Sequence, residues 1–306
     1  MSAEILAFGG INMGLVTRSA RIPEPGETLR GTRFYHSSGG KGATQAVAAA
    51  RLGARVKMVG RVGNDLFGPV LCAALCRDGV DVGAIAVDEE HASGVGVIMV
   101  DPQGQNRVLA TYGANLYCGD GELAAVEQGL AQAQVLMLQM EIPFPVSLRA
   151  AQYARERGVR VLLDPAPATE VALEDFAHFD IVAPNQTEAE YYTGLAVVDE
   201  NSARRAAAVL LEWGVGIAII KMGELGVYFE SDQTRGFVPP FAVEAVDTTS
   251  AGDAFHGALA VALAEGRDLA AAVRFGAAAG ALAVTRPGVQ DAMPTRAAVE
   301  TLLAEN

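Results

Sequence analysis

The chain has 306 residues, enough for one large α/β domain or two smaller ones with a substantial buried core. Its 23 Lys and Arg against 36 Asp and Glu give a formal net charge of −13. This charge argues against binding to nucleic acid or to an anionic membrane, because the field of the whole molecule repels phosphate. The 51% of hydrophobic residues excludes a disordered chain, and no apolar run is long enough to span a membrane. The first ten residues do not resemble a signal peptide, and the three cysteines are an odd number, so we expect a cytoplasmic protein with reduced thiols.

Short, almost continuously apolar runs alternate with longer Ala-rich segments of helical period. The runs predict buried strands over 4–10, 56–63, 135–140, 159–165, 180–185 and 216–223. The segments between them predict helices over 41–52, 67–77, 145–157, 202–213, 253–265 and 269–284. This alternation is typical of an α/β fold with a central, mainly parallel sheet flanked by helices.

Two strand-like stretches interrupt the alternation, over 13–38 and over 93–112. The first contains Pro23, Pro25 and Gly26, and the second predicts a hairpin around Asp101–Gly104. Both stretches are too short to fold alone. We therefore expect one domain over 1–306, in which the two insertions together form a small β lid over one end of the main sheet.

A Gly-rich segment runs from Ser37 to Gly42 with the sequence SSGGKG. It resembles a phosphate-binding loop, but Gly42 follows Lys41 where the Walker pattern needs Ser or Thr. Two interpretations stay open. The segment is either a structural turn, or a turn that opens a helix and lets bare backbone N–H groups approach a polar ligand closely.

A second segment, DTTSAGD, runs from Asp247 to Asp253 and leads into a strongly helical run. Asp253 could simply be a helix N-cap. A cap does not explain seven consecutive small or polar residues, whereas an anion-binding helix N-terminus does. The backbone N–H groups of Ala251, Gly252 and Asp253 could hold a phosphoryl group while the Asp253 carboxylate takes a proton from a hydroxyl. Phosphoryl transfer to an alcohol requires this combination.

A third segment, PNQTEAE, runs from Pro184 to Glu190, directly after a predicted strand. The structural interpretation is a capping box between Thr187 and Glu190. The functional interpretation places Asn185 and Glu188 at the carboxyl end of a strand, where open α/β sheets bind ligands. There the two residues could order Mg²⁺ beside a polyphosphate.

These segments resemble the ribokinase-like family of carbohydrate kinases over essentially the whole chain. The matching segments are GGIN, PEPGETLRG, GGKGATQAVAAARLGA, TYGAN, VLMLQME, DPAPA, APNQTEAE, KMGELGV, DTTSAGDAFHGALA and AVTRPGVQ. The resemblance implies transfer of the γ-phosphoryl group of ATP to the primary hydroxyl of a sugar. D-ribose, which would give D-ribose 5-phosphate, is the first expectation. The family pattern also implies a homodimer formed through the lid.

The resemblance also implies roles for individual residues. Asp253 would be the base, and Ala251, Gly252 and Asp253 the anion hole. The sugar pocket would comprise Asn12, Gly14, Gly39, Gly40, Lys41, Thr44, Glu141 and Asp253. The nucleotide would meet Asn185, Lys221, Gly223, Gly226 and Gly252, with Glu188 serving Mg²⁺. An activating K⁺ would lie in a loop of Asp247, Thr249, Ala283, Arg286 and Gly288.

The chain departs from the family pattern at four positions. Gly14 and Thr44 stand where family members that bind ribose carry Asp and Asn, so we hypothesise a hole where sugar hydroxyls are normally held. Lys221 replaces a common Thr, and Ala292 replaces a Ser after the K⁺ loop. The alternative is therefore a kinase for another sugar or for a nucleoside. A non-catalytic sugar sensor is disfavoured, because such a protein need not keep the residues of the anion hole.

Overall fold

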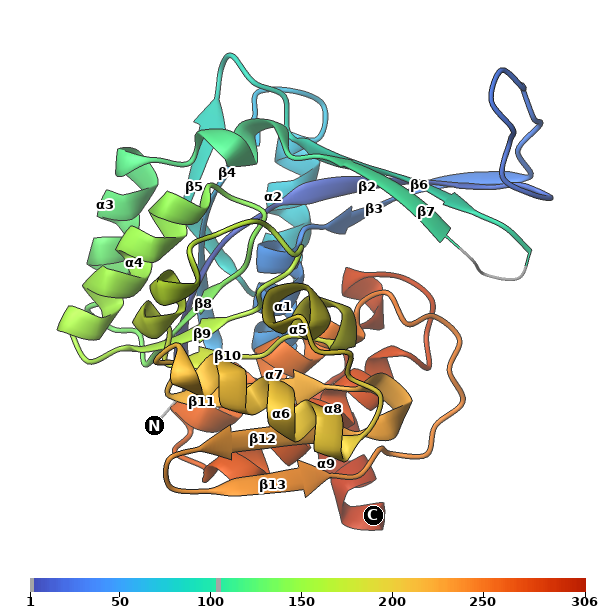
Figure 1. Ribbon diagram of the computed structural model, residues 1–306. Coiled ribbons are helices and arrows are strands. Elements are labelled where there is room, and N and C mark those ends of the chain that lie inside the picture. The colour runs from blue at the N-terminus through green and yellow to red at the C-terminus, as the bar shows by residue number, and fades with distance from the viewer. Residues whose placement is uncertain (1–2, 103–105) are drawn as a thin grey trace.

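The apolar runs pair into one nine-stranded sheet in the computed structural model, which describes residues 3–102 and 106–306 (Figure 1). The strand order is β13-β12-β11-β10-β9-β8-β1-β4-β5. The strands are β1 (Glu4–Phe8), β4 (Arg55–Gly63), β5 (Asp81–Asp88), β8 (Val135–Leu138), β9 (Arg160–Leu163), β10 (Ile181–Val182), β11 (Ile217–Lys221), β12 (Val227–Ser231) and β13 (Arg235–Val238). All neighbours from β5 to β11 are parallel, and only β12 and β13 are antiparallel. The predicted mainly parallel sheet is confirmed.

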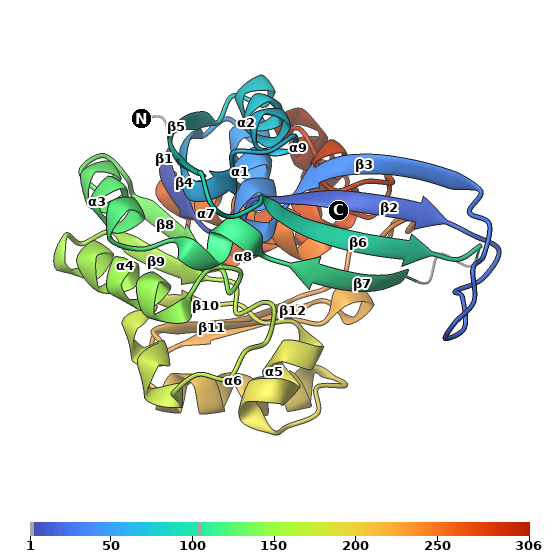
Figure 2. The ribbon, with the colours of Figure 1, turned by 90° about the horizontal axis from the view of Figure 1, so that it is seen from above.

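Helices cover both faces of this sheet, as Figure 2 shows. One face carries α1 (Lys41–Arg51), α2 (Gly68–Arg77), α7 (Ala251–Ala264), α8 (Leu269–Ala283) and α9 (Arg296–Glu305). The other carries α3 (Asp120–Gly129), α4 (Phe144–Glu156), α5 (Gln186–Thr193) and α6 (Glu200–Glu212). Successive strand residues point to opposite faces, so β1 sends Ile5 and Ala7 into one apolar core and Leu6 and Phe8 into the other. None of the described helices is both long and apolar enough to cross a membrane.

A separate four-stranded sheet extends away from the main body (Figures 1 and 2). Its order is β3 (Arg33–Gly39), β2 (Asn12–Arg18), β6 (Gly94–Val100) and β7 (Asn106–Thr111). Strands β2 and β6 are parallel, and the other two pairs are antiparallel. The expected small β sheet is thus present, with two strands from each interrupting stretch. The predicted turn at Asp101–Gly104 lies partly outside the described residues.

Several elements differ from the sequence-based expectation. The strand predicted over 180–185 is only Ile181–Val182, because Pro184 lacks the N–H that a longer ladder needs. Strands β5, β12 and β13 were not predicted, and neither were helices α3, α5 and α9. β5 lies at an edge of the sheet and is largely half-exposed, so it has no continuous apolar run. α5 has only eight residues, too few for a clear helical period.

Candidate active site

Four of the residues predicted to form the site lie where parallel strands end and where α1 and α7 begin. Lys41 is the first residue of α1, Asp253 lies in the first turn of α7, and Lys221 ends β11. Glu141 follows β8 by three residues. Open α/β sheets bind ligands at this edge, since the loops after parallel strands converge there.

The Gly-Gly turn before α1 is required by close backbone packing. Gly40 has a φ of 88°, and a Cβ on it would lie 2.5 Å from the carbonyl oxygen of Gly10. No other residue type fits there without moving the backbone. The turn directs the Lys41 N–H to Glu141 Oε2 at 2.7 Å. The packing confirms a structural role for Gly40, and the same turn places Lys41 at the start of α1, beside Glu141.

Asp253 is a buried carboxylate with one oxygen engaged and the other available. Its Oδ1 accepts a hydrogen bond from Gln45 Nε2 at 3.1 Å and lies 3.6 Å from Lys41 Nζ. Among the described residues, no partner is found for Oδ2. Burial raises the pKa of Asp253 above its ordinary value, although the Lys41 ammonium acts in the opposite direction. A carboxylate of raised pKa with a free oxygen is suited to accept a proton.

Asp164, which follows β9, lies behind this base and was not predicted as a site residue. Its Oδ2 accepts from Lys41 Nζ and from Gln45 Nε2, both at 3.0 Å, and its Oδ1 lies 3.3 Å from Lys221 Nζ. Burial by itself would raise the pKa of this carboxyl. The His256 ring, which is charged once it is protonated at low pH, and the ammonium groups of Lys221 and Lys41 outweigh burial, so the pKa lies well below its ordinary value. Asp164 is therefore a permanent negative charge.

His256, one turn after Gly252 on α7, is fully buried beside Asp164. Its Nδ1 lies 2.8 Å from the Gly252 carbonyl oxygen, so Nδ1 must carry the hydrogen. Its Nε2 has no hydrogen-bond partner and lies 3.6 Å from Asp164 Oδ1. Burial lowers the pKa of His256 to about 3, so the ring is neutral at pH 7. Neither its spacing nor its neighbours in the sequence pointed to this residue.

Asn185 and Glu188 form a reciprocal capping box at the start of α5. Glu188 N donates to Asn185 Oδ1 at 2.9 Å, and Asn185 N donates to Glu188 Oε2 at 2.8 Å. The capping box predicted between Thr187 and Glu190 is wrong by two residues, because α5 begins earlier, at Gln186. Burial, followed by the charge of Asp164, raises the pKa of Glu188.

This carboxylate suits a magnesium ion that is held mainly by phosphate. Across 3–102 and 106–306, no group of three His, Cys, Asp or Glu side chains could hold a metal ion. Mg²⁺ is commonly bound through one or two carboxylates, with substrate phosphates and water supplying the other ligands. Glu188 is one such carboxylate, and it lies near Lys221, because Asn185, which donates to both of its carboxylate oxygens, forms an isolated backbone bridge with Lys221.

The turn after Lys221 contains two glycines in the left-handed region. Gly223 has a φ of 59° and Gly226 a φ of 100°. A Cβ on Gly226 would lie 2.5 Å from the carbonyl oxygen of Val238, whereas one on Gly223 would meet nothing within 4 Å. Gly226 is therefore fixed by packing, and Gly223 leaves space beside the backbone that a ligand could approach.

The loop predicted to bind K⁺ brings two distant segments together. Thr249 donates to Asp247 Oδ1 through its N at 3.0 Å and its Oγ1 at 2.6 Å, and Gly288 N lies 3.4 Å from Asp247 Oδ2. Ala283 and Arg286 belong to one turn at the end of α8, in which Arg286 N bonds to the Ala283 carbonyl at 3.4 Å. Ala292 is buried and offers no hydroxyl.

The sugar-side departures do not open the space that the sequence suggested. A Cβ on Gly14 would lie 2.9 Å from Ser37 Oγ, because Gly14 and Ser37 are paired in the four-stranded sheet. Thr44 is fully buried and its hydroxyl has no partner. The hypothesis of a hole at these two residues is therefore corrected. Ser37 limits the space at Gly14, and Thr44 contributes no surface to a pocket.

Polar side chains near the predicted sugar pocket include those of Asn12, Glu141 and Tyr112. Asn12 opens β2, and its Oδ1 accepts from Asn115 Nδ2 at 2.9 Å, while Gly39 ends the neighbouring β3. Burial raises the pKa of Glu141 to about 7, against the opposing effect of Lys41. Tyr112, which was not predicted, has its pKa raised to about 12 by burial and by the charge of Glu141.

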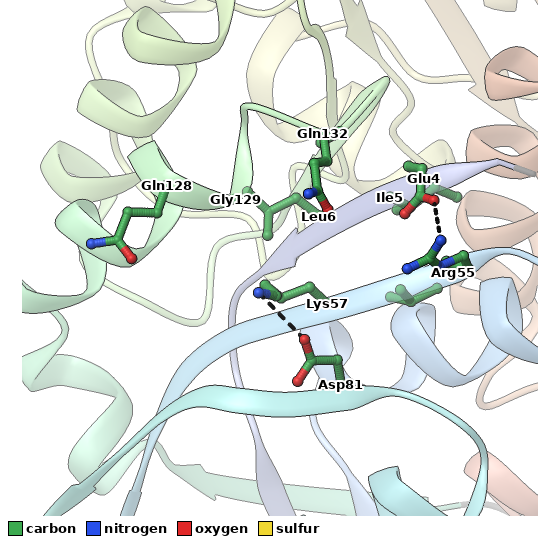
Figure 3. Close-up of a pocket in the computed structure, with 11 residues that line it drawn as sticks. Glu4, Ile5, Leu6, Arg55, Lys57, Asp81, Gln128, Gly129 and Gln132 are labelled. Carbon is green, nitrogen blue, oxygen red and sulfur yellow. Dashed lines mark ion pairs between the residues drawn. The ribbon is translucent and has the colours of Figure 1, made fainter.

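A pocket at the opposite end of the strands from the candidate site contains none of these residues (Figure 3). It lies where β1 and β4 begin, and its charges are paired. Arg55 lies 3.1 Å from Glu4, and Lys57 lies 3.3 Å from Asp81. None of the predicted site residues lines it.

Comparison with known proteins agrees with this architecture. The sequence model of the pfkB family of carbohydrate kinases matches residues 2–296. Ribokinase from Haemophilus influenzae is 38% identical over 296 residues, covering 97% of each chain. Deoxyribokinase from Salmonella typhi is 33% identical over 293 residues, covering 95% of this chain and 96% of the relative. The structure of Arabidopsis thaliana ribokinase complexed with ribose and ATP has a TM-score of 0.89 and 31% identity, with 99% of each chain covered.

The fold and the family match together define a phosphotransferase that acts on a sugar hydroxyl. The chain belongs to the pfkB family of carbohydrate kinases.

Proposed function

We propose that the protein is a ribokinase that transfers the γ-phosphoryl group of ATP to the primary hydroxyl of D-ribose, giving D-ribose 5-phosphate. The similarity to the Haemophilus influenzae ribokinase over nearly the whole chain supports this substrate. So does the fold shared with the Arabidopsis thaliana ribokinase, which was solved with ribose and ATP. The observation that carries the proposal is the Asp253 carboxylate, which lies in the first turn of α7 with one oxygen held by Gln45 and the other available.

The transfer uses Asp253 as general base. Its carboxylate takes the proton as the hydroxyl oxygen attacks the γ-phosphorus, and the bond from that phosphorus to the oxygen bridging it to the β-phosphorus breaks, releasing ADP. The N–H groups of Ala251, Gly252 and Asp253 at the positive end of α7 stabilise the negative charge on the transferred group. Lys221 is placed to add a positive charge, because a Cβ on Gly252 would lie only 3.5 Å from its Nζ.

Other residues hold the substrates and ions in this proposal. The sugar is bound by Asn12, Gly39, Gly40, Lys41 and Glu141, and the nucleotide by Asn185, Lys221, Gly223 and Gly226. Glu188 serves Mg²⁺, which neutralises phosphate charge when bound. K⁺ lies in the loop of Asp247, Thr249, Ala283, Arg286 and Gly288. The whole chain is one kinase domain, its small sheet is a lid that pairs with a second copy in a homodimer, and the protein works in the cytoplasm.

The direct test is release of ADP when the purified protein is mixed with ATP, Mg²⁺ and D-ribose. The proposal predicts ribose-dependent ADP release and formation of ribose 5-phosphate, with no stimulation by a ribose analogue that lacks the primary hydroxyl. ADP release that ribose does not stimulate would contradict it.

A second candidate substrate is a sugar that lacks a secondary hydroxyl. It is favoured by Gly14 and by the sealed Thr44, which remove two polar groups that the family pattern places against ribose hydroxyls. The similarity to the Salmonella typhi deoxyribokinase agrees with this choice. Comparing kcat/KM for D-ribose, 2-deoxy-D-ribose and a set of nucleosides separates the candidates. A larger kcat/KM for the deoxy sugar would replace ribose as the substrate.

A further inference from the structure

The buried carboxylate of Asp164 joins a lysine on the sugar side of the site to a lysine on the nucleotide side. Lys41 Nζ lies 3.0 Å from its Oδ2, and Lys221 Nζ lies 3.3 Å from its Oδ1. The side chain of Asp164 has no exposed surface, and that of Lys221 is only 12% exposed. Charges removed from water need a counter-charge close by, and this one carboxylate supplies it to both lysines.

This cluster contains charges of both signs. Lys41 and Lys221 are positive, Asp164 is negative, and Asp253 lies 3.6 Å from Lys41. His256 packs against the cluster from α7 and is neutral, because burial lowers its pKa to about 3. The other titratable groups acting on these residues are the buried carboxyls of Glu141 and Glu188. Removing the Asp164 carboxylate therefore takes from Lys221 the carboxylate with which it forms an ion pair.

Lys221 lies close to the N-terminus of α7, where the proposed reaction takes place. Its Nζ lies 3.5 Å from the position that a Cβ on Gly252 would occupy, beside the N–H groups of α7. The family pattern often has threonine at this position, which needs no buried counter-charge. Lysine at 221 does need one, and Asp164 supplies it.

Resting on the proposed kinase function, we propose that Asp164 is a positioning residue that holds Lys41 and Lys221 on either side of the α7 N-terminus. In this arrangement Asp164 and Lys221 form one functional unit. The carboxylate of Asp164 is needed at the nucleotide side only because position 221 is a lysine.

The test is a double-mutant cycle with Asp164→Asn, Lys221→Thr and both together, measuring kcat and both Michaelis constants. Asp164→Asn is expected to lower kcat/KM for ATP by about 10- to 100-fold in the native chain, since it leaves a buried ammonium unpaired. In the Lys221→Thr chain the same substitution is expected to cost less than about threefold, because the coupled partner is absent. The Michaelis constant for the sugar is expected to rise in both backgrounds, because Lys41 loses a partner in both.

Asp180→Asn is the matched control. Asp180 precedes β10, and its carboxylate accepts a hydrogen bond from Val161 N at 2.8 Å, away from the two lysines. The Asp180→Asn variant should keep both Michaelis constants within about twofold of the native values, as substitutions away from such clusters usually do. If Asp164→Asn alone does not fold, a double variant that does fold would show the same coupling between Asp164 and Lys221, and a double variant that also fails to fold would contradict it.

Two results would overturn the proposal. Equal losses of kcat/KM for ATP in the two backgrounds would show that Asp164 acts independently of Lys221. No change in either Michaelis constant on Asp164→Asn would show that the carboxylate positions neither lysine. A native chain that releases no ADP would instead refute the proposed function. Failure of the proposed function is therefore distinguishable from failure of the Asp164 proposal.

Discussion

At the scale of single residues, the orientation of the proposed base is set by an amide. Gln45 Nε2 donates to Asp253 Oδ1 at 3.1 Å and to Asp164 Oδ2 at 3.0 Å, and Gln45 Oε1 accepts from Gln139 Nε2 at 2.8 Å. Gln139 thereby fixes which end of the Gln45 amide faces the two carboxylates. The base is held by a chain of side chains that reaches from β8 to α7.

Asp253→Asn is expected to lower kcat by about 10²- to 10⁴-fold, the usual range for loss of a general base. The amide keeps the shape of the side chain, so the Michaelis constant for ATP should change little. Single-turnover kinetics and ATP titration of the variant measure the two effects. A variant that retains more than about a tenth of the native kcat would exclude Asp253 as the base.

Glu141 is expected to make sugar binding depend on pH near neutrality. Its pKa is raised to about 7, so the fraction ionised falls about tenfold from pH 8 to pH 6. The ionised carboxylate accepts hydrogen bonds from hydroxyls, and the protonated carboxyl does so less well. The Michaelis constant for the sugar should therefore rise by up to about tenfold as the pH falls from 8 to 6. In Glu141→Gln this dependence should disappear, and a variant with the native pH profile would show that another group titrates.

At the scale of elements, the sequence predicts best what a local pattern determines. The six apolar runs and six Ala-rich segments were found because buried parallel strands and their covering helices have continuous patterns. α5 and the edge strands lack such patterns. In the site, Asp253 was predicted from a motif and Lys41 and Glu141 from the family resemblance, whereas Asp164 was not predicted. Its importance comes from contacts with Lys41 and Lys221, 123 and 57 residues away, which no local pattern records.

The loop between Asp247 and Gly288 supports a prediction about ions. K⁺ is expected to raise kcat relative to Na⁺ at equal ionic strength, because the Asp247 carboxylate already ties the two segments of this loop beside the α7 N-terminus. Initial rates in chloride salts of the two ions measure the effect. Ala292→Ser, which restores the residue of the family pattern, should strengthen it. Equal rates in both salts, in both proteins, would mean that the loop binds no activating cation.

At the scale of the whole molecule, the lid sheet exposes apolar side chains on one face. Val97 and Leu109 are paired across β6 and β7, so they share a face, and they are 43% and 71% exposed. Exposed apolar patches of this kind mark interaction surfaces. They support the proposed pairing of two lids.

Leu109→Asp is therefore expected to convert a dimer into a monomer, since it places a charge in an apolar interface. Sedimentation velocity over a range of concentrations measures the mass. Leu66→Asp is the control, because Leu66 is 87% exposed but lies outside the lid. A native protein that is monomeric at all concentrations, or a Leu109→Asp variant that remains dimeric, would contradict the proposed interface.

The lid strands start and end at the sugar side of the site. Asn12 is the first residue of β2, Gly39 is the last residue of β3, and the two are paired across the sheet. Lys221 and Glu188 lie at the end of β11 and on α5, and β11 belongs to the other sheet. Self-association through the lid would thus be thermodynamically linked to occupancy by sugar and nearly independent of occupancy by nucleotide. Diluting the enzyme would lower its affinity for the sugar, and adding sugar would favour association of the dissociated subunits.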